Sequence, residues 1–385
     1  MILYGQQDIN QLDIDSVVDV LQSDFLTQGA KVPQFEQAIC DYTKAKYAVA
    51  VNSATSALHI ACLALGVSNG DSVWTSPITF VASANCALYC GASVDFVDID
   101  INTGNLCPDA LAVKLAVANQ TGTLPKVVIA VHLAGHSCDM AKLALLADQY
   151  GFDIIEDASH AIGGDYGSEK IGACQYSKVC IFSFHPVKII TTAEGGVATT
   201  QDSDLAEKMA MLRSHGVTKE PTQLLRPDEG EWYYEQHHLG FNYRMTELQA
   251  ALGITQLGRL DDFVATRNQI AQSYDAGLDA KHIFTVKPIT SSQSAYHLQI
   301  VRLLNFQQRK QVFNKMREKG IQVHVHYYPV HLQPFYLKLG FQSGDFPQAE
   351  AFYQQILTLP LHPNLNASEV DFIITELNQL ALTEY

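Results

Sequence analysis

The stretch VVIAVHLAGHSCDMAKLALLADQYGFDIIED, residues 127–157, contains two short apolar runs separated by a segment of helical length. The runs are VVIAV (127–131) and DIIE (153–156), and both have the length of buried strands. The same alternation extends over residues 45–200, with further runs at AVAV (48–51), SVWT (72–75), SVDFV (93–97), VCIFSF (179–184) and VATT (197–200). This pattern predicts an α/β fold with a mainly parallel, seven-stranded sheet covered on both faces. Ligands of such sheets bind beyond the carboxyl ends of the strands.

Helical patterns flank this block on both sides. Before it, residues 13–23 and 32–42 predict two helices, and after it a helical region runs from Thr246 to about residue 278. Residues 283–385 alternate again, with a helix expected over 305–319 and a strand over Ile321 to His326. We therefore expect a large domain with an N-terminal arm over 1–250 and a small α/β domain over 251–385.

Composition and charge narrow the function classes. The chain has 385 residues, 47% of them hydrophobic, so it can bury a large core. Its net charge of -15 argues against nucleic acid and anionic membranes as partners. The eight cysteines form no CxxC pair, and the start MILYGQQDIN lacks the basic and apolar regions of a secretory signal. These features predict a cytoplasmic protein with buried thiols.

The segment Asn52 to Ala57 leaves one predicted strand and opens a helix. Ala54, Thr55 and Ser56 lie in this turn, where free backbone N–H groups of a helix N-terminus can bind a phosphate. An ordinary helix cap is the alternative reading of the same residues.

The segment Ile154 to His160 delivers Asp157 to the end of a buried strand. A buried carboxylate needs a cationic partner, and a protonated pyridine nitrogen at about 4 Å would contribute about 4 kcal/mol at an intermediate dielectric. A helix cap or a metal ligand are the alternatives. His160, one turn further on, could hydrogen-bond this carboxylate or a ligand, or be a core histidine bonded to backbone.

The segment SFHPVKIITTAEGG, residues 183–196, surrounds Lys188 with apolar and small residues. Such a lysine is expected to have a lowered pKa, and a neutral amine can form an imine with an aldehyde. Ser183, at the end of its strand, can add a hydroxyl to a phosphate site. The role of His185 stays open. Asn242, beside the start of a helix, offers two amide donors for an anion, or it is a cap.

The strings NSATSALH, TSPITFVASAN, EDASHAIG, SFHPVKIITTAEGG and GFNYRMTELQAALG occur in this order along the chain. Together they resemble the DegT-type family of pyridoxal-phosphate (PLP)-dependent nucleotide-sugar aminotransferases, from about Tyr4 to the C-terminus. The resemblance implies a fold type I, aspartate-aminotransferase-like architecture with PLP bound by the large domain. It also implies a homodimer whose active sites are shared between the subunits.

The resemblance further implies the roles of individual residues. Lys188 would be the Schiff-base lysine, Asp157 the partner of the pyridine nitrogen, and Phe80 the residue stacked on the cofactor ring. Thr55 and Ser183 would hold the phosphate, together with Asn242 from the neighbouring subunit. The residues implied for the sugar-nucleotide and substrate site are Tyr4, Asp24, Phe25, Leu26, Thr27, His185, His326, Tyr327, Tyr328 and Pro329.

The combination of the strings LTQG, SFHPVKIITTAEGG and VHYYPVHLQPFY is most similar to the branch of the family that serves pseudaminic acid synthesis. This implies transfer of the amino group of L-glutamate to C4 of a UDP-4-keto-6-deoxy-N-acetylhexosamine. The alternatives are another UDP- or dTDP-keto-sugar, or a PLP-binding homologue without catalysis. A PLP sugar dehydratase of the same family is disfavoured because it would carry His in place of Lys188. A NAD-dependent enzyme is disfavoured because no GxGxxG follows a strand near the N-terminus.

Histidines at 237, 238, 324, 326 and 331 could suggest a metal site. No adjacent Cys or carboxylate completes a coordination set in the sequence, so we expect no metal.

Overall fold

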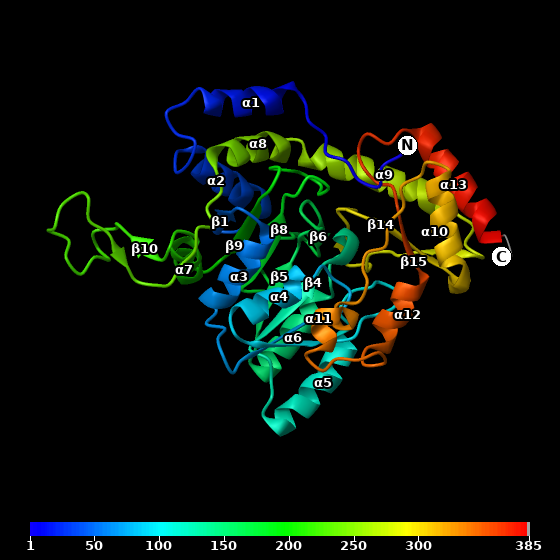
Figure 1. The fold of residues 1–385 in the computed structure, drawn as a ribbon, viewed down its shortest axis with the longest axis horizontal. Helices are drawn as coiled ribbons and strands as arrows, with labels where there is room; N and C mark the ends of the chain where they lie inside the picture. The colour runs from blue at the N-terminus through cyan, green and yellow to red at the C-terminus, as the bar shows by residue number, and fades with distance from the viewer. Residues whose placement is uncertain (383–385) are drawn as a thin grey trace.

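The computed structural model describes residues 1–382, and its centre is a seven-stranded sheet in the order β1-β9-β8-β5-β4-β2-β3 (Figure 1). Strand β9 pairs antiparallel with both of its neighbours, and the other neighbouring pairs run parallel. The strands are β1 (Tyr47–Val51), β2 (Ser72–Thr75), β3 (Ser93–Phe96), β4 (Val127–Val131), β5 (Asp153–Asp157), β8 (Val179–Ser183) and β9 (Gly196–Thr200). The predicted mainly parallel sheet is confirmed, and every strand boundary falls within one residue of its apolar run.

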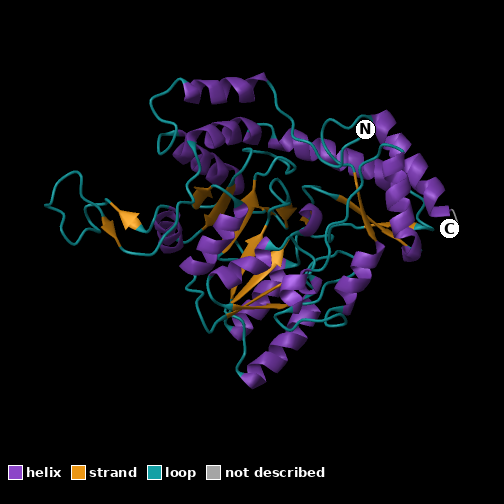
Figure 2. Ribbon diagram, in the orientation of Figure 1, coloured by secondary structure: helices purple, strands orange, loops and turns teal. Residues whose placement is uncertain are grey.

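Helices cover both faces of this sheet (Figure 2). In β4, Val127 and Ile129 pack into one buried cluster, and Val128 and Ala130 pack into another. This division follows from the alternation of side chains along a strand, and it explains why the runs are continuously apolar. The first cluster includes α3 (Ala54–Ala64), α4 (Ala82–Tyr89) and α7 (Ser203–Arg213), and the second includes α5 (Pro108–Thr121) and α6 (Met140–Tyr150).

The N-terminal helices pack beside the helices that follow the sheet. Helix α1 lies over α8 in Figure 1. Buried Asp13 anchors this arm, because its carboxylate accepts hydrogen bonds from Thr255 and Arg259, both at 2.5 Å. The helices are α1 (Gln11–Leu21), α2 (Lys31–Thr43), α8 (Glu247–Leu257) and α9 (Leu260–Gly277). All four correspond to helices predicted from the sequence.

The C-terminal part contains a three-stranded antiparallel sheet in the order β12-β14-β15. A separate buried cluster joins this sheet to α9, α10 and α13. Leu298, Ile300 and Ile356 pack instead into the core of the large sheet. The domain boundary near residue 250 therefore stays a prediction. The elements are β12 (Ile283–Thr285), β14 (Gln299–Leu303), α10 (Arg309–Glu318), α11 (Pro334–Leu337), α12 (Pro347–Gln355), β15 (Ile356–Leu359) and α13 (Ala367–Leu382).

The strand predicted over Ile321 to His326 is wrong. Ile321 forms one isolated bridge with Ile2, and His324 forms another with Thr358. Each of these bridges joins a single pair of residues, and the two bridges involve different partner segments. No continuous ladder of hydrogen bonds therefore forms along residues 321–326.

The polar stretch 214–240 forms a two-stranded hairpin that extends from the body, at the left of Figure 1. Its strands are β10 (Val217–Thr218) and β11 (Glu235–Gln236). Large apolar side chains are exposed on or next to it, among them Leu225, Trp232 and Leu239.

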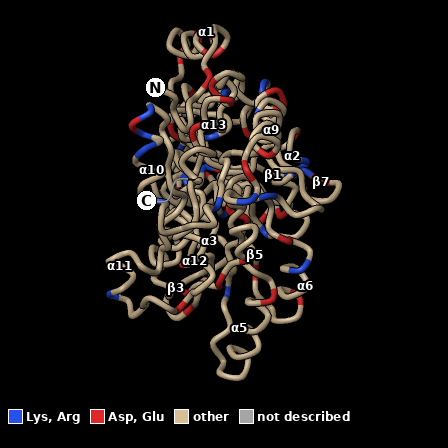
Figure 3. The backbone as a smooth tube through the Cα atoms, turned by 90° about the vertical axis from the view of Figure 1, so that its right-hand side faces the viewer, with Lys and Arg blue, Asp and Glu red and all other residues tan. Residues whose placement is uncertain are grey.

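A further small sheet joins β6 (Asp165–Tyr166), β7 (Glu169–Lys170) and β13 (Ser292–Gln293). Short 3-10 helices cover Leu133–Gly135, Phe306–Gln308 and Val330–Leu332. Acidic and basic residues are interspersed along the backbone in Figure 3.

Candidate active site

A cavity of about 470 Å³ lies beyond the carboxyl ends of the sheet strands. Asp157 ends β5 and Ser183 ends β8, and the turns after β1 and β2 add further side chains. Parallel strands place these ends at one edge, so segments far apart in the sequence meet there. Of the residues singled out in the sequence, the cavity is lined by Tyr4, Ala54, Thr55, Phe80, Asp157, His160, Ser183, His185, Lys188, His326 and Tyr327.

The N-terminus of α3 forms one wall of the cavity. Ser53 caps the helix, because its Oγ accepts a hydrogen bond from the Ser56 N–H at 3.1 Å. Ser56 is buried and its hydroxyl donates to Asn52 Oδ1 at 2.7 Å, so Ser56 supports the turn and does not line the cavity. Ala54 and Thr55 line it at the end of the helix where backbone N–H groups are free for an anion.

Gly196 allows β9 to approach this turn closely. A Cβ at position 196 would lie 2.5 Å from the backbone N of Ala54, closer than two such atoms can come. Glycine at position 196 is therefore required by the packing of β9 against the first turn of α3.

Asp157 presents a buried carboxylate to the cavity, with only 6% of its surface exposed. Oδ2 accepts a hydrogen bond from Ser83 Oγ at 2.6 Å. Oδ1 accepts two from Ser159, from Oγ at 2.5 Å and from the backbone N–H at 3.1 Å. These three bonds fix the carboxylate, and the described residues place no Lys or Arg in an ion pair with it. A cationic ligand group is therefore the partner that this carboxylate lacks.

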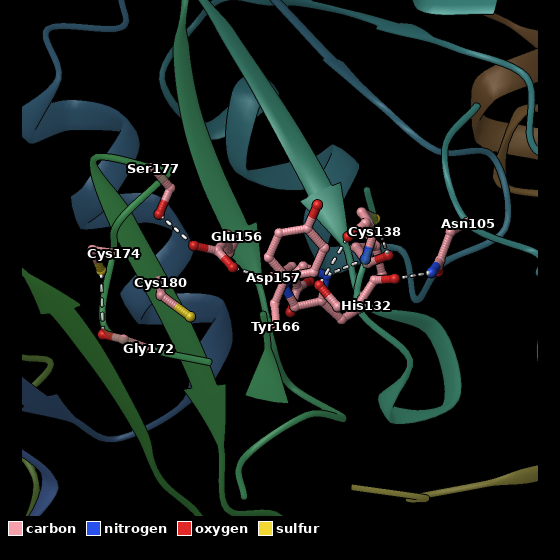
Figure 4. A network of polar contacts seen from close by, with 12 residues as sticks. Asn105, His132, Cys138, Glu156, Asp157, Tyr166, Gly172, Cys174, Ser177 and Cys180 are labelled. Carbon is pink, nitrogen blue, oxygen red and sulfur yellow. Dashed lines mark hydrogen bonds and ion pairs between the residues drawn. The ribbon is translucent and has the colours of Figure 1, made fainter. Parts of the chain in front are cut away.

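Glu156, the residue before Asp157, is held by a separate polar network (Figure 4). Its carboxylate accepts from Ser177 Oγ at 2.5 Å and contacts His132 Nε2 at 2.8 Å. The Cys138 backbone N–H donates to His132 Nδ1 at 3.2 Å, which leaves Nε2 as the donor to Glu156. Both carboxylates at the end of β5 are thus held in place by hydrogen bonds.

Lys188 lies in the loop after β8, and its side chain enters the cavity. Its backbone N–H donates to the His185 carbonyl at 2.8 Å, which closes a tight turn. Burial lowers the pKa of the Lys188 amine to about 8, although the charge of Asp157 acts in the opposite direction. This agrees with the lowered pKa expected from the sequence. A substantial fraction of the amine is neutral near pH 7 to 8, as a nucleophilic amine requires.

Several histidines surround the amine, and burial keeps them neutral. It lowers the pKa of His326 to about 3, with smaller contributions from His324 and Lys188. The pKa values of His160 and His297 are also well below the ordinary value, mainly through burial. His160 Nε2 contacts the Tyr327 hydroxyl at 3.1 Å, while its Nδ1 has no partner among residues 1–382. His160 is therefore not the backbone-bonded core histidine that the sequence left open.

Other residues singled out in the sequence lie outside the cavity of the single chain. The segment Asp24 to Thr27 is exposed beside α8, where the Leu26 carbonyl accepts from the Glu247 N–H at 3.0 Å. Asn242 is exposed next to the α3 turn, and its carbonyl accepts from Asn52 Nδ2 at 3.4 Å. Tyr328 and Pro329 follow Tyr327 but do not line the cavity.

The sequence reading missed several residues that the fold brings to the site. Ser83 and Ser159 position Asp157, Thr79 contacts the Ser83 hydroxyl at 2.8 Å, and His297 packs against His160 with ring centroids 4.4 Å apart. Thr79 lies in the bend before α4 and Ser83 in its first turn, so both follow strand β2, and this position was an available signal. No local sequence motif indicates that His297 belongs to the site.

The cavity fits PLP. It combines a helix N-terminus for a phosphate, a buried carboxylate without a cationic partner, and a nucleophilic amine. Among residues 1–382 no cluster of three or more His, Cys, Asp or Glu side chains has the arrangement of a metal site. Over the same residues no helix is both long and apolar enough to cross a bilayer.

Comparison with known proteins shows the family. The sequence model of the DegT/DnrJ/EryC1/StrS aminotransferase family matches residues 7–378. The UDP-4-amino-4,6-dideoxy-N-acetyl-beta-L-altrosamine transaminase of Campylobacter jejuni is 38% identical over 378 residues, which cover 97% of this chain and 96% of that protein. The spore coat polysaccharide biosynthesis protein SpsC of Bacillus subtilis is 37% identical over 372 residues, covering 95% and 93%.

Solved structures agree with this assignment. Helicobacter pylori PseC, an aminotransferase involved in the biosynthesis of pseudoaminic acid, superposes with a TM-score of 0.89 at 31% identity and covers 98% of both chains. The PLP form of the putative sugar aminotransferase Spr1654 from Streptococcus pneumoniae gives 0.88 at 30% identity, covering 99% and 98%. The chain therefore belongs to the DegT/DnrJ/EryC1/StrS aminotransferase family and is a PLP-dependent sugar aminotransferase of fold type I.

Proposed function

We propose that this enzyme transfers the amino group of L-glutamate to C4 of a UDP-4-keto-6-deoxy-N-acetylhexosamine. The product would be UDP-4-amino-4,6-dideoxy-N-acetyl-beta-L-altrosamine, for pseudaminic acid biosynthesis in the cytoplasm. The names and full-length coverage of the Campylobacter and Helicobacter relatives support this choice of sugar. The observation that carries the proposed chemistry is the meeting of Lys188 and Asp157 in one cavity with the N-terminus of α3.

We assign the binding of the cofactor to residues that line the cavity. Bound PLP supplies an aldehyde that accepts an amino group and a ring that takes up electrons from the reacting carbon. The free N–H groups at Ala54 and Thr55, with the Ser183 hydroxyl, would bind its phosphate. Phe80 lines the cavity with 60% of its surface exposed, so its ring is free to stack on the cofactor.

Lys188 and Asp157 would carry the chemistry. The Asp157 carboxylate, fixed by Ser83 and Ser159, would pair with the pyridine nitrogen and keep it protonated. Lys188 Nζ would hold the cofactor covalently between turnovers. Once released from the cofactor, the same amine would be free to take a proton from the donor carbon and later return one to the sugar carbon. A pKa near 8 suits both directions of transfer.

Histidine and tyrosine side chains of the cavity would bind the sugar nucleotide and the amino donor. Tyr4, His185, His326 and Tyr327 line the cavity and offer hydrogen bonds. Burial lowers the pKa of His326 to about 3, so this histidine adds no positive charge there. We assign the exposed segment Asp24 to Thr27 to a site completed by a second copy in a homodimer. Exposed Tyr328 and Asn242, with buried Pro329 beside Tyr328, would belong to the same site.

The experiment is incubation of the enzyme with PLP, L-glutamate and a panel of UDP- and dTDP-4-keto-6-deoxy sugars. Product mass and NMR stereochemistry should show C4 amination of the UDP-N-acetylhexosamine. Lys188→Ala should lose turnover, whereas Lys178→Ala, which removes an exposed lysine of the same region, should keep it.

Preferential amination of a dTDP sugar would replace the proposed substrate and leave the aminotransferase chemistry in place. Binding of PLP without turnover of any sugar would indicate a homologue that has lost catalysis.

A further inference from the structure

His297 lines the active-site cavity together with Lys188 and His160. It lies in the bend that precedes β14, and only 5% of its surface is exposed. Its ring packs against the ring of His160, with centroids 4.4 Å apart. The proposed mechanism gives this side chain no role.

The backbone at His297 is closely packed against the turn that follows β4. The Leu298 N–H donates to the Ala134 carbonyl at 3.3 Å. A Cβ at Gly135 would lie 3.1 Å from the His297 backbone N and 2.8 Å from the His160 carbonyl, so these backbones are in direct contact. The imidazole is therefore presented to the cavity from a fixed backbone.

A fully buried cation lies on the other side of this segment. Arg267 of α9 is 1% exposed. Its Nη1 donates to three backbone carbonyls, those of Tyr296 and His297 at 3.3 Å and that of Leu361 at 2.8 Å. Among residues 1–382 its Nε and Nη2 have no partner, and no carboxylate forms an ion pair with it. A buried charge without a counter-ion favours an anion nearby.

The His297 imidazole can act as a neutral hydrogen-bond donor. Burial lowers its pKa well below the ordinary value, and the neighbouring His160, Lys188 and Arg267 act in the same direction. Its Nδ1 is enclosed without a partner among residues 1–382, which leaves Nε2 as the nitrogen that can reach a cavity ligand. When a ligand oxygen accepts at Nε2, the ring proton lies there, because Nδ1 has no acceptor.

The charged residues of the cavity restrict what this donor can bind. Among the described residues that line the cavity, Lys188 is the one Lys or Arg, and its amine is needed for the chemistry. The acidic residues of the lining are Asp157, assigned to the pyridine nitrogen, and exposed Glu194. An amino donor with carboxylates therefore needs a further donor in an electropositive setting, and His297 beside Arg267 offers one.

We propose that the Nε2–H of His297 binds a carboxylate of the amino donor and that the buried charge of Arg267 attracts this carboxylate. The inference rests on the proposed function in taking an amino acid as the donor, and it does not depend on which sugar is the acceptor. His297 would then determine donor specificity, because an amine without a carboxylate gains nothing from this contact.

The test is isothermal titration of the PLP-loaded enzyme with glutarate, a dicarboxylate that has no amino group to transfer. His297→Phe keeps a ring against His160 and removes the donor. The dissociation constant should rise roughly 10- to 100-fold, the range expected for loss of a hydrogen bond to a charged group. His297→Gln places an amide N–H near the position of Nε2 and should restore most of the affinity.

A second readout is the half-reaction with L-glutamate. In His297→Phe the half-saturating concentration of L-glutamate should rise by a similar factor, while the maximal rate changes little. The matched control is His362→Phe. His362 also has an enclosed Nδ1 without a partner among residues 1–382 and lies in the field of Arg267, but it does not line the cavity. This variant should bind glutarate as the wild type does.

Wild-type affinity for glutarate in His297→Phe would overturn the proposal. So would an equal loss of affinity for glutarate and for UDP, because UDP has no carboxylate and its loss would report a general disturbance of the cavity. A crystal structure of the wild type with glutarate should show a carboxylate oxygen about 3 Å from His297 Nε2, which decides the question even if the variant fails to fold. Failure of every sugar in the substrate panel would leave these results standing, since glutarate binding involves no sugar.

Discussion

Replacing Asp157 with Asn tests the electrostatic part of the mechanism. The carboxylate is 6% exposed and its three hydrogen bonds come from neutral groups, so its charge is available to the pyridine nitrogen. At about 4 Å and an effective dielectric of about 20, the attraction is about 4 kcal/mol. This corresponds to about three pK units of the ring nitrogen, and thus to a rate lower by about 10³ near neutral pH.

The assay is the half-reaction with L-glutamate, followed by stopped-flow absorbance of the bound cofactor. Asn keeps the volume of Asp. Its amide oxygen can accept from the Ser159 backbone N–H, and its amide N–H can donate to Ser83 Oγ, whose hydroxyl can donate to the Phe80 carbonyl, so the thermal midpoint should change little. Asp153→Asn, at the opposite end of β5, is the matched control and should react as the wild type does. A half-reaction in Asp157→Asn within tenfold of the wild-type rate would refute the reasoning.

Three further predictions concern residues around the same cavity. The rate at which the apoenzyme captures PLP should rise with pH through about 8. Burial lowers the pKa of Lys188 from 10.5, and the neutral amine is the reactive form. Stopped-flow rates with a midpoint near pH 10 would contradict this. Ser83→Ala should slow the glutamate half-reaction by roughly 10- to 100-fold, because a hydrogen bond to a charged group contributes about 1.5–3 kcal/mol. An unchanged rate would mean that Asp157 does not need the hydrogen bond from Ser83. Gly196→Ala should lower the free energy of unfolding, measured in urea, by about 1–3 kcal/mol and should weaken PLP binding, because the new Cβ meets the Ala54 backbone. A variant with the stability and the PLP affinity of the wild type would disprove the clash.

The large sheet could be predicted because its strands are buried on both faces. Continuous apolar runs such as VVIAV leave no alternative to a buried strand between helices, and the structure ends each strand within one residue of its run. The order of the strands and the antiparallel direction of β9 depend on long-range pairing, which no local pattern encodes. The false strand at Ile321 has the same origin, because its apolar pattern is real but its backbone lacks a continuous partner.

Some residues of the candidate site could likewise be predicted from the sequence, whereas others could not. Asp157 ends a strand, and Thr55 and Lys188 lie in the segments that leave β1 and β8, so their convergence could be inferred from the topology of parallel sheets. Ser83 was missed because a serine in the apolar helical segment after β2 looks like a core residue, although its hydroxyl bonds to Asp157. His297 reaches the cavity from the C-terminal part of the chain, and only the tertiary structure shows this.

The covalent attachment of the cofactor tests the central assignment most directly. The enzyme is loaded with PLP, reduced with borohydride, digested and mapped by mass spectrometry. We predict one reduced pyridoxyl group, carried by the peptide that contains Lys188. Attachment at another lysine, or no attachment in an enzyme that still turns over, would contradict the account.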